Sequence, residues 1–481
     1  MLEDIKKTFR KSIVYALGNM STKLIGLILI PLYTNQAYLS VNDYGALSIL
    51  EITSQVLVAL FSLTLSQSLT RWYWDEKFVD KQKSIFFTSM LSLFFVSLLG
   101  LTAVILLSSN ISSLLFGNTD YTYVINLLII NSVLQILIMN AQTLLKLQSK
   151  AFYYSLVNIV KFTLSLVFTF YFIIGLGKKL DGIFEASVIG SAAALIILLP
   201  YIIRNSRIRI ETKILLQMLD YSYPLMLASI SGVFFSVVDR YSLNYMEGLE
   251  KVGIYTLGYK MSSALKVIII TSIQLALSPL LMKKMNDPDN RQYYAKVMTY
   301  FSMVLMFCVI GLSLFSLEVI KVAVKDIIYW ESANIVAILS FSFYFGMLKD
   351  TAFIGLLVVK RTKISGVLIT LSSFINLGLN IILIPKFSIY GAAIATLLSQ
   401  IVFFMLIYLT AQRFYKIPYE LKKVFSPMVA GIILITAGFF INELAIGLRL
   451  AVKIILLGAF PVYVYFGKLI NRESINDFLK G

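Results

Sequence analysis

The chain has 481 residues, of which 58% are hydrophobic and only 14% are charged, whereas soluble proteins carry about 25% charged residues. It contains no histidine and a single cysteine, Cys308. An intrachain disulfide is therefore excluded, and the commonest general base and transition-metal ligand is absent. We expect an all-α polytopic membrane protein without catalytic residues or a metal site.

Apolar runs recur from one end of the sequence to the other, each long enough to cross roughly 30 Å of hydrocarbon as a helix. The sequence predicts about fourteen such helices. They are expected at residues 13–36, 46–69, 84–107, 121–145, 152–175, 183–203, 221–240, 253–281, 298–317, 332–358, 364–384, 391–410, 424–441 and 448–467. No long polar segment is left over for a separate soluble domain.

Lysine and arginine residues accumulate in alternate loops between the predicted helices. The loop after residue 69 contains Arg71, Lys77, Lys81 and Lys83, whereas the next loop, residues 108–120, contains none. Short loops with this bias orient a membrane protein with its basic side in the cytoplasm. The net charge of +17 is therefore a topology signal rather than a nucleic-acid footprint, and we expect both termini in the cytoplasm.

The first predicted helix carries a charge inside its apolar stretch. Lys23 has no acidic residue nearby in the sequence. An ionisable group in a spanning helix costs about 2.5–3.5 kcal/mol, so such a group usually faces a hydrated cavity or a partner. A short polar loop and the sequence Asp43-Tyr44-Gly45 follow this helix, and we expect Gly45 to begin the second helix.

Further charges fall within the predicted helices of both halves of the chain. They are Glu51, Lys161, Glu185, Asp239, Arg240, Lys260, Lys266, Lys349 and Asp350. Lysines suit an anionic substrate and bind phosphate as point charges. We therefore expect Lys23, Lys161 and Lys260 to line a hydrated cavity that binds the substrate.

The remaining charges have other expected roles. Glu51, Asp239 and Arg240 are candidates for ion coupling or for charge pairs within the membrane. Lys453 lies near the start of the last predicted helix, where we expect its long side chain to reach the interface.

The second half of the sequence repeats the first. A shift of 208 residues pairs Tyr15 with Tyr223, Leu17 with Leu225, Tyr33 with Tyr241, Gly45 with Gly253 and Ser54 with Ser262. The shift spans six predicted helices, so both copies cross the membrane in the same direction, as in parallel transporter repeats. We expect an N-terminal six-helix lobe at residues 1–206, a C-terminal six-helix lobe at 207–415 and two additional helices at 416–481.

Small residues recur at four-residue spacing on one predicted helix of the first lobe. They are Gly182, Ala186, Gly190 and Ala194. Gly391 and Ala395 match Gly182 and Ala186 at a shift of 209 residues. Because small residues let helix backbones approach closely in lipid, we expect both stripes to serve packing.

Two short motifs and the six-plus-six-plus-two plan resemble a known family. The motifs are Asp43-Tyr44-Gly45, behind the first helix, and Tyr390-Gly391-Ala392-Ala393-Ile394-Ala395-Thr396, at the entrance to the twelfth. Over essentially its whole length the chain resembles Wzx-type flippases of the multidrug/oligosaccharidyl-lipid/polysaccharide exporter superfamily. The resemblance implies two lobes that give alternating access to a central cavity.

The resemblance also implies a function. The protein would move an undecaprenyl-diphosphate-linked oligosaccharide across the bacterial cytoplasmic (inner) membrane for surface-polysaccharide biosynthesis, such as O-antigen. Its partners would be the polyprenyl-diphosphate-linked glycan, membrane lipids, and the polysaccharide polymerase and chain-length machinery. Relatives that flip peptidoglycan precursors use cavity cations in the first, second and eighth helices. This sequence has Lys23 and Lys260 in two of these helices but Glu51 in the second.

Two other functions stay open. A cation-coupled multidrug or metabolite antiporter of the same fold would use a cavity acid such as Glu51 or Asp239. A membrane glycosyltransferase or polymerase is less expected, because every predicted outer loop is short. The sequence has no phosphate-binding loop with Gly-Lys-Ser/Thr, so we expect no cofactor, and Na⁺, H⁺ or the membrane potential would drive transport.

Overall fold

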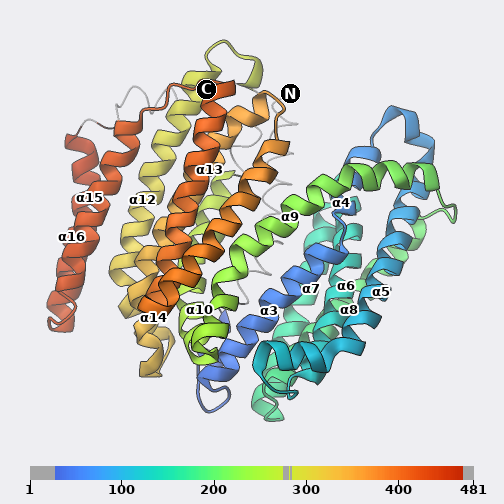
Figure 1. Ribbon diagram of the computed structural model, residues 1–481, viewed down its shortest axis with the longest axis horizontal. Coiled ribbons are helices and arrows are strands. Elements are labelled where there is room, and N and C mark those ends of the chain that lie inside the picture. Colours follow the sequence, from blue (N-terminus) through green and yellow to red (C-terminus); the bar gives the residue numbers. More distant parts are fainter. Residues whose placement is uncertain (1–25, 27, 275–280, 282–283, 468, 470–481) are drawn as a thin grey trace. The chain divides into compact units, whose positions relative to one another are not determined.

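The computed structural model describes residues 26, 28–274, 281, 284–467 and 469, so Lys23 lies outside the described residues. The regular elements of the described chain are all helical (Figure 1). In chain order they are α2 (Ile30–Tyr33), α3 (Val41–Phe61), α4 (Leu65–Trp72), η1 (Glu76–Lys81), α5 (Gln82–Phe116), α6 (Thr122–Leu147), α7 (Ala151–Phe170), η2 (Tyr171–Gly175), α8 (Leu180–Asn205), α9 (Thr212–Glu247), α10 (Leu249–Ala264), η3 (Leu265–Ile270), η4 (Lys284–Asn286), α12 (Asn290–Ala323), η5 (Ile327–Ser332), α13 (Ala333–Val358), α14 (Lys363–Phe414), α15 (Leu421–Phe440) and α16 (Ile446–Phe466).

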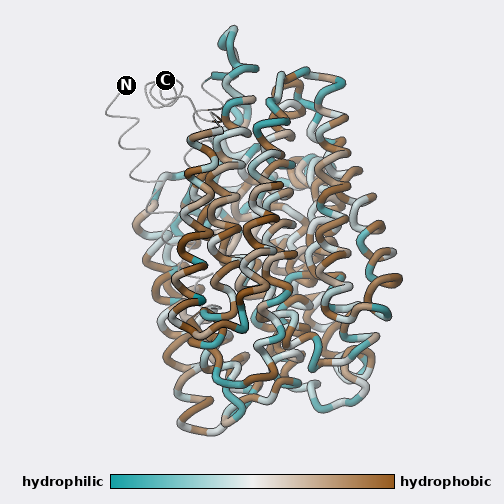
Figure 2. Tube along the Cα trace, turned by 90° about the vertical axis from the view of Figure 1, so that its left-hand side faces the viewer, coloured by the Kyte–Doolittle hydropathy of each residue, from teal (hydrophilic) through white to brown (hydrophobic). Residues whose placement is uncertain are grey.

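The all-α membrane fold predicted from the sequence is confirmed. Eleven helices within the described ranges are long and apolar enough to span a membrane, and α14 contains two of the predicted spans. The eighth predicted span corresponds to α10 and η3, and the first lies mostly outside the described residues. Hydrophobic positions fill the middle of the helices and hydrophilic ones gather at their ends (Figure 2).

The chain divides into two compact units. Unit 1 comprises Met1–Gly253 and Ile369–Leu377, and unit 2 comprises Ile254–Leu368 and Gly378–Gly481. These units differ from the predicted repeat, because α9, the expected first helix of the second lobe, belongs to unit 1. The division into lobes after residues 206 and 415 is inferred from the internal sequence repeat, not from contacts, and it stays a prediction.

Unit 1 is a helical bundle in which α6 packs against α5 and α8, and α7 packs against α8. Its core includes Phe86, Ile136, Leu144 and Leu198, each fully buried. The predicted packing role of the small-residue stripe on α8 is confirmed at Gly190, where a β-carbon would overlap the Ser165 hydroxyl of α7.

Helix α9 lies against α3 and α4 and is joined to them by hydrogen bonds between hydroxyl groups. The Ser68 hydroxyl lies 2.6 Å from that of Ser222, and the Thr53 hydroxyl lies 2.8 Å from that of Tyr241. In hydrocarbon such bonds satisfy polar groups that lipid cannot. They add specific polar contacts to the packing of α9 within unit 1.

The start of α3 corrects the expectation for Gly45. Ser40 caps this helix: its hydroxyl accepts the N–H of Asp43 at 3.1 Å, and the Asp43 carboxylate accepts the N–H of Ser40 at 2.9 Å. This capping box begins the helix at Val41, ahead of Gly45. A β-carbon at Gly45 would overlap the carbonyl oxygen of Leu249, so the glycine permits a close approach of two backbones.

Unit 2 is built around α12 and α13, and the additional helix α15 packs against α12. The backbone of α14 breaks at Ser388, where φ is 48° and ψ is −128°. A β-carbon at Gly391 would overlap the carbonyl oxygen of Leu383. Eight residues advance about 12 Å in an unbroken helix, so the chain has reversed direction here, and α14 consists of the eleventh and twelfth predicted spans.

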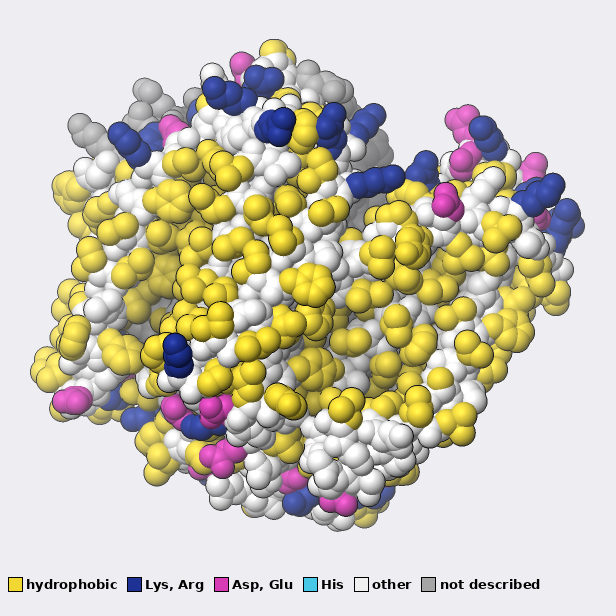
Figure 3. Space-filling model, viewed as in Figure 1, with side chains coloured by type: hydrophobic (Ala, Val, Ile, Leu, Met, Phe, Trp, Pro, Cys, Tyr) yellow, Lys and Arg dark blue, Asp and Glu magenta, His cyan; other side chains and the backbone are white. Residues whose placement is uncertain are grey.

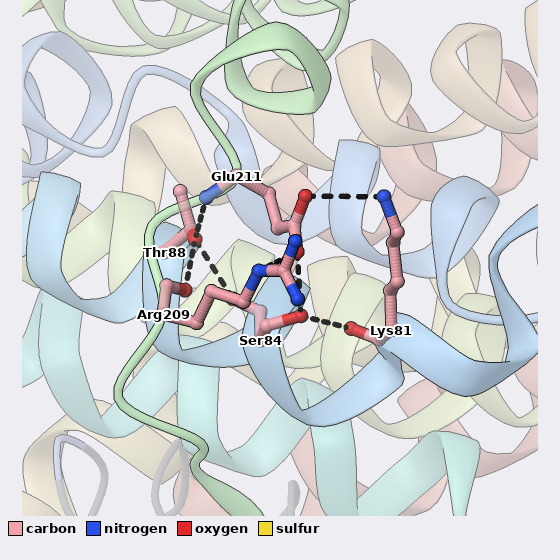
Figure 4. A network of polar contacts seen from close by, with 5 residues as sticks. All are labelled: Lys81, Ser84, Thr88, Arg209 and Glu211. Carbon is pink, nitrogen blue, oxygen red and sulfur yellow. Dashed lines mark hydrogen bonds and ion pairs between the residues drawn. The ribbon is translucent and has the colours of Figure 1, made fainter.

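A polar network fixes the connection between α8 and α9 (Figure 4). The Glu211 carboxylate lies 3.3 Å from Lys81 Nζ and 3.2 Å from Arg209 Nε. The Thr88 hydroxyl accepts the N–H of Glu211 at 3.0 Å, and Ser84 donates to the carbonyl of Lys81 at 2.9 Å. This network lies on the basic side predicted to face the cytoplasm. On the face drawn in Figure 3, Lys and Arg side chains gather mainly at one end of the helices.

Candidate functional site

Glu51, an acidic residue of α3 in unit 1, lies near tyrosine side chains. Tyr44, Ser48 and Glu51 follow one another along α3 at spacings of four and three residues, which places them on one face of the helix. The half-buried Glu51 acts electrostatically on the buried phenols of Tyr33 and Tyr44. The Tyr33 hydroxyl is hydrogen-bonded to Thr169 at the end of α7.

This arrangement, the Glu51 cluster, consists of Tyr33, Tyr44, Glu51 and Thr169. One carboxylate and several hydroxyl oxygens suit a proton or a hard cation, which prefers oxygen ligands. No group of three or more His, Cys, Asp or Glu residues that could hold a metal ion occurs in the described part of the chain. The chemistry of the cluster is therefore that of a single ionisable acid.

Lys161, the predicted cavity lysine of unit 1 that the structure describes, lies in the middle of α7. Its side chain is half-buried, and within the described ranges it forms no hydrogen bond and no ion pair. One turn earlier, Asn158 accepts a hydrogen bond from Gln142 at 3.0 Å, so the neighbouring polar groups are already engaged with one another. The Lys161 ammonium therefore has no protein partner among the described residues.

Asp239 and Arg240, near the end of α9, form a buried pair. Arg240 Nε lies 3.5 Å from Asp239 Oδ1, and the guanidinium also donates to the carbonyl oxygen of Ser236. Only 2% of Asp239 and 7% of Arg240 are exposed. The two opposite charges therefore offset one another within unit 1.

Unit 2 holds Lys260 and a second adjacent pair. Lys260 is half-buried in α10 and belongs to a different unit from Lys161 and Glu51. Lys349 Nζ lies 2.5 Å from Asp350 Oδ1, and Gln274 donates to Asp350 at 2.9 Å. Asp350 and Gln274 line an otherwise mainly apolar cavity of about 260 Å³.

A buried charge cluster in unit 2 corrects the expectation for Lys453. Its ammonium lies 2.8 and 2.9 Å from the two carboxylate oxygens of Glu318, and only 1% of the residue is exposed. Arg449 Nε lies 2.8 Å from the same carboxylate. Lys453 does not reach the interface, because it fastens α16 to α12.

Sequence reasoning did not find this cluster. Arg449 and Lys453 are four residues apart and share a face of α16, which is the one local signal. Their acid, Glu318, belongs to another helix, and its closeness to Lys453 follows from tertiary packing alone.

Comparisons with known proteins support the family suggested by the motifs. The family of polysaccharide biosynthesis proteins matches residues 8–285, more than half of the chain. The uncharacterized membrane protein MJ1068 of Methanocaldococcus jannaschii is 23% identical over 306 residues, which cover 60% of this chain and 59% of that protein. The alignment therefore spans less than two thirds of this relative.

Solved structures share the fold. The lipid II flippase MurJ, in an inward closed conformation, superimposes with a TM-score of 0.70 and 14% identity, covering 95% of this chain and 100% of that chain. An inward-facing multidrug resistance MATE transporter of the MOP superfamily has a TM-score of 0.68 and 13% identity, covering 83% and 94%. The chain belongs to the polysaccharide biosynthesis protein family of Wzx-type flippases and has the fold of the MOP transporters.

Proposed function

We propose that the protein is an alternating-access flippase that moves an undecaprenyl-diphosphate-linked oligosaccharide across the cytoplasmic membrane for surface-polysaccharide biosynthesis. Its family and its MOP transporter fold support transport of this kind. The observation that carries the proposal is Lys161, a half-buried cation of a spanning helix without a partner among the described residues. The polymerase and chain-length machinery would receive the product.

In this proposal the lysines hold the diphosphate. Lys161 in unit 1 and Lys260 in unit 2 bind its oxygens in charge-assisted hydrogen bonds, and Lys23 is the third proposed ligand. Outward movement of an anion is favoured by an inside-negative potential by about 2.3 kcal/mol per charge per 100 mV. Lysines that travel with the cargo offset part of this drive.

The Glu51 cluster is the proposed coupling site. Binding of Na⁺ or H⁺ at Glu51 would change the charge of a half-buried acid beside two phenols, and this change would bias one conformation over the other. The Asp239–Arg240 pair is proposed to add no net charge to the end of α9 during the same movement.

A cation-coupled multidrug antiporter is the second candidate. The Glu51 carboxylate favours this function, because an acid within the membrane also suits a cationic drug. The fold shared with MATE transporters favours it as well. In such an antiporter the available ammonium of Lys161 would repel the substrate, which makes this the weaker candidate.

Reconstitution into vesicles separates the two candidates. The purified protein is supplied in parallel with a fluorescent polyprenyl-diphosphate-linked oligosaccharide and with a cationic drug under a Na⁺ or H⁺ gradient. We expect movement of the lipid-linked oligosaccharide between leaflets and no drug transport. Drug transport without movement of the lipid would establish the antiporter instead.

A further inference from the structure

Unit 1 has a cavity whose lining contains none of the charged residues discussed above. It has a volume of about 720 Å³, within the usual range for ligand sites, and is open to solvent. Residues of the start of α3, of the end of α5 and its connection to α6, of the end of α9 and of the start of α10 line it. They include Asn42, Phe116, Tyr121, Tyr241 and Tyr245.

The lining combines aromatic rings with amide side chains. Four aromatic residues and three asparagines contribute to it. The ring centroids of Phe116 and Tyr121 lie 4.1 Å apart. Two glycines, Gly117 and Gly248, shape its rim with φ of 74° and 88°, a backbone region that other residues seldom adopt.

The described residues that line this cavity include no Asp, Glu, Lys or Arg. The acid next to Asn42 in sequence, Asp43, is engaged by Ser40 and by Lys179, whose ammonium lies 3.0 Å away. The Tyr121 pKa is raised by burial and by the Asp43 and Asp120 carboxylates, so its phenol stays a neutral hydrogen-bond donor. The cavity therefore suits neither a diphosphate nor a cationic drug.

Two side chains of the lining have polar groups that are free to bind a ligand. Asn42 and Tyr245 are exposed, the latter by 89%, and neither forms a hydrogen bond or ring contact with the described chain. An amide offers both donors and an acceptor, and a tyrosine offers a flat apolar face with a hydroxyl at its edge. Both match a sugar ring, which has hydroxyl groups around its rim and apolar C–H faces.

We propose that this cavity binds the neutral sugar residues of the cargo, at the side of the membrane predicted to be extracytoplasmic. The inference rests on the proposed flippase function and adds to it a glycan site distinct from the lysines that hold the diphosphate. The bound glycan would lie beside α5, α6 and α9, where Tyr245 and Asn42 contact it.

The test uses the purified full-length chain and the oligosaccharide that mild acid releases from the polyprenyl-diphosphate pool of the cells that carry the protein. Binding is measured by saturation-transfer NMR. We expect Tyr245→Ala and Asn42→Ala each to weaken the apparent affinity about fivefold or more. Tyr223→Ala is the matched control, because Tyr223 is also an exposed tyrosine of α9 but does not line the cavity; we expect it to bind like the wild type.

Three results would each overturn the glycan site. The wild type could fail to bind the sugar, or both cavity variants could bind it as tightly as the wild type does. The third result is displacement of the sugar by inorganic pyrophosphate. Flipping of the lipid-linked oligosaccharide is measured on the same preparations. Flipping without glycan binding would refute glycan binding by the cavity but not the proposed flippase function. Absence of flipping would refute the flippase function, whether or not the sugar binds.

Discussion

Two lysines within spanning helices, Lys161 in unit 1 and Lys453 in unit 2, have opposite surroundings. Lys453 is fully buried and shares the carboxylate of Glu318 with Arg449. Lys161 is half-buried and has no ion pair within the described ranges. The difference teaches that an intramembrane charge is not functional by position alone. A charge that the fold has already neutralised serves stability, whereas one left without a protein partner is available to cargo.

The largest loss of stability is expected for Glu318→Ala. The change leaves Lys453 and Arg449 buried without their carboxylate, and breaking a buried pair costs about 3–5 kcal/mol. Thermal unfolding of the detergent-purified protein measures the loss. The control is Glu420→Ala, which removes an exposed pair with Lys423 and should cost about 0–1 kcal/mol. Equal stability of the two variants would show that the buried cluster does not fasten α16.

A smaller loss is expected for Gly45→Ala. The added methyl group meets the backbone of Leu249 rather than a movable side chain, and such overpacking costs about 1–3 kcal/mol. Gly378→Ala is the control, because a β-carbon there meets nothing within 4 Å. An unchanged unfolding temperature for Gly45→Ala would contradict the close approach of the two backbones.

The capping box of α3 should contribute less. Ser40→Ala removes the side-chain cap and is expected to cost about 1 kcal/mol. Lys179→Ala removes only an exposed ion pair with Asp43 and should cost about 0–1 kcal/mol. The same unfolding assay at low and high salt separates them, because only the ion pair is screened. A greater loss for Lys179→Ala would reverse the assigned importance of the two contacts.

The smallest effect on stability is expected for Lys161→Gln. No ion pair or hydrogen bond among the described residues is lost, so the free energy of unfolding should stay within about 1 kcal/mol of the wild type. Circular dichroism and thermal unfolding measure it. A loss as large as that of Glu318→Ala would mean that Lys161 is structural, like Lys453.

The sequence predicts the spans well because a helix in lipid must present an apolar run of fixed length. It predicts less about what those helices contact. Glu318 and Lys453 are 135 residues apart, and nothing local to either marks the other as its partner. Asp43-Tyr44-Gly45 lies near the start of α3, as the motif suggests. The helix cap, however, depends on Ser40, and the close contact of Gly45 depends on the distant Leu249.

The candidate site is predictable only in part for the same reason. Hydropathy reveals that Lys161, Lys260 and Glu51 interrupt apolar segments, and helical spacing places Tyr44 on the same face of α3 as Glu51. The Tyr33 phenol and its partner Thr169 come from outside α3, and no local pattern marks them. The aromatic and amide cavity of unit 1 has no sequence motif, because its lining comes from three separate segments.

The rate of flipping by Lys161→Gln, compared with Lys161→Arg in the same vesicles, tests the central claim most directly. If the ammonium binds the diphosphate, the loss of one charge-assisted hydrogen bond should slow movement of the lipid-linked oligosaccharide about tenfold or more. Lys161→Arg, which keeps the charge, should retain most of the rate. A wild-type rate in Lys161→Gln, with normally folded protein, would contradict the account.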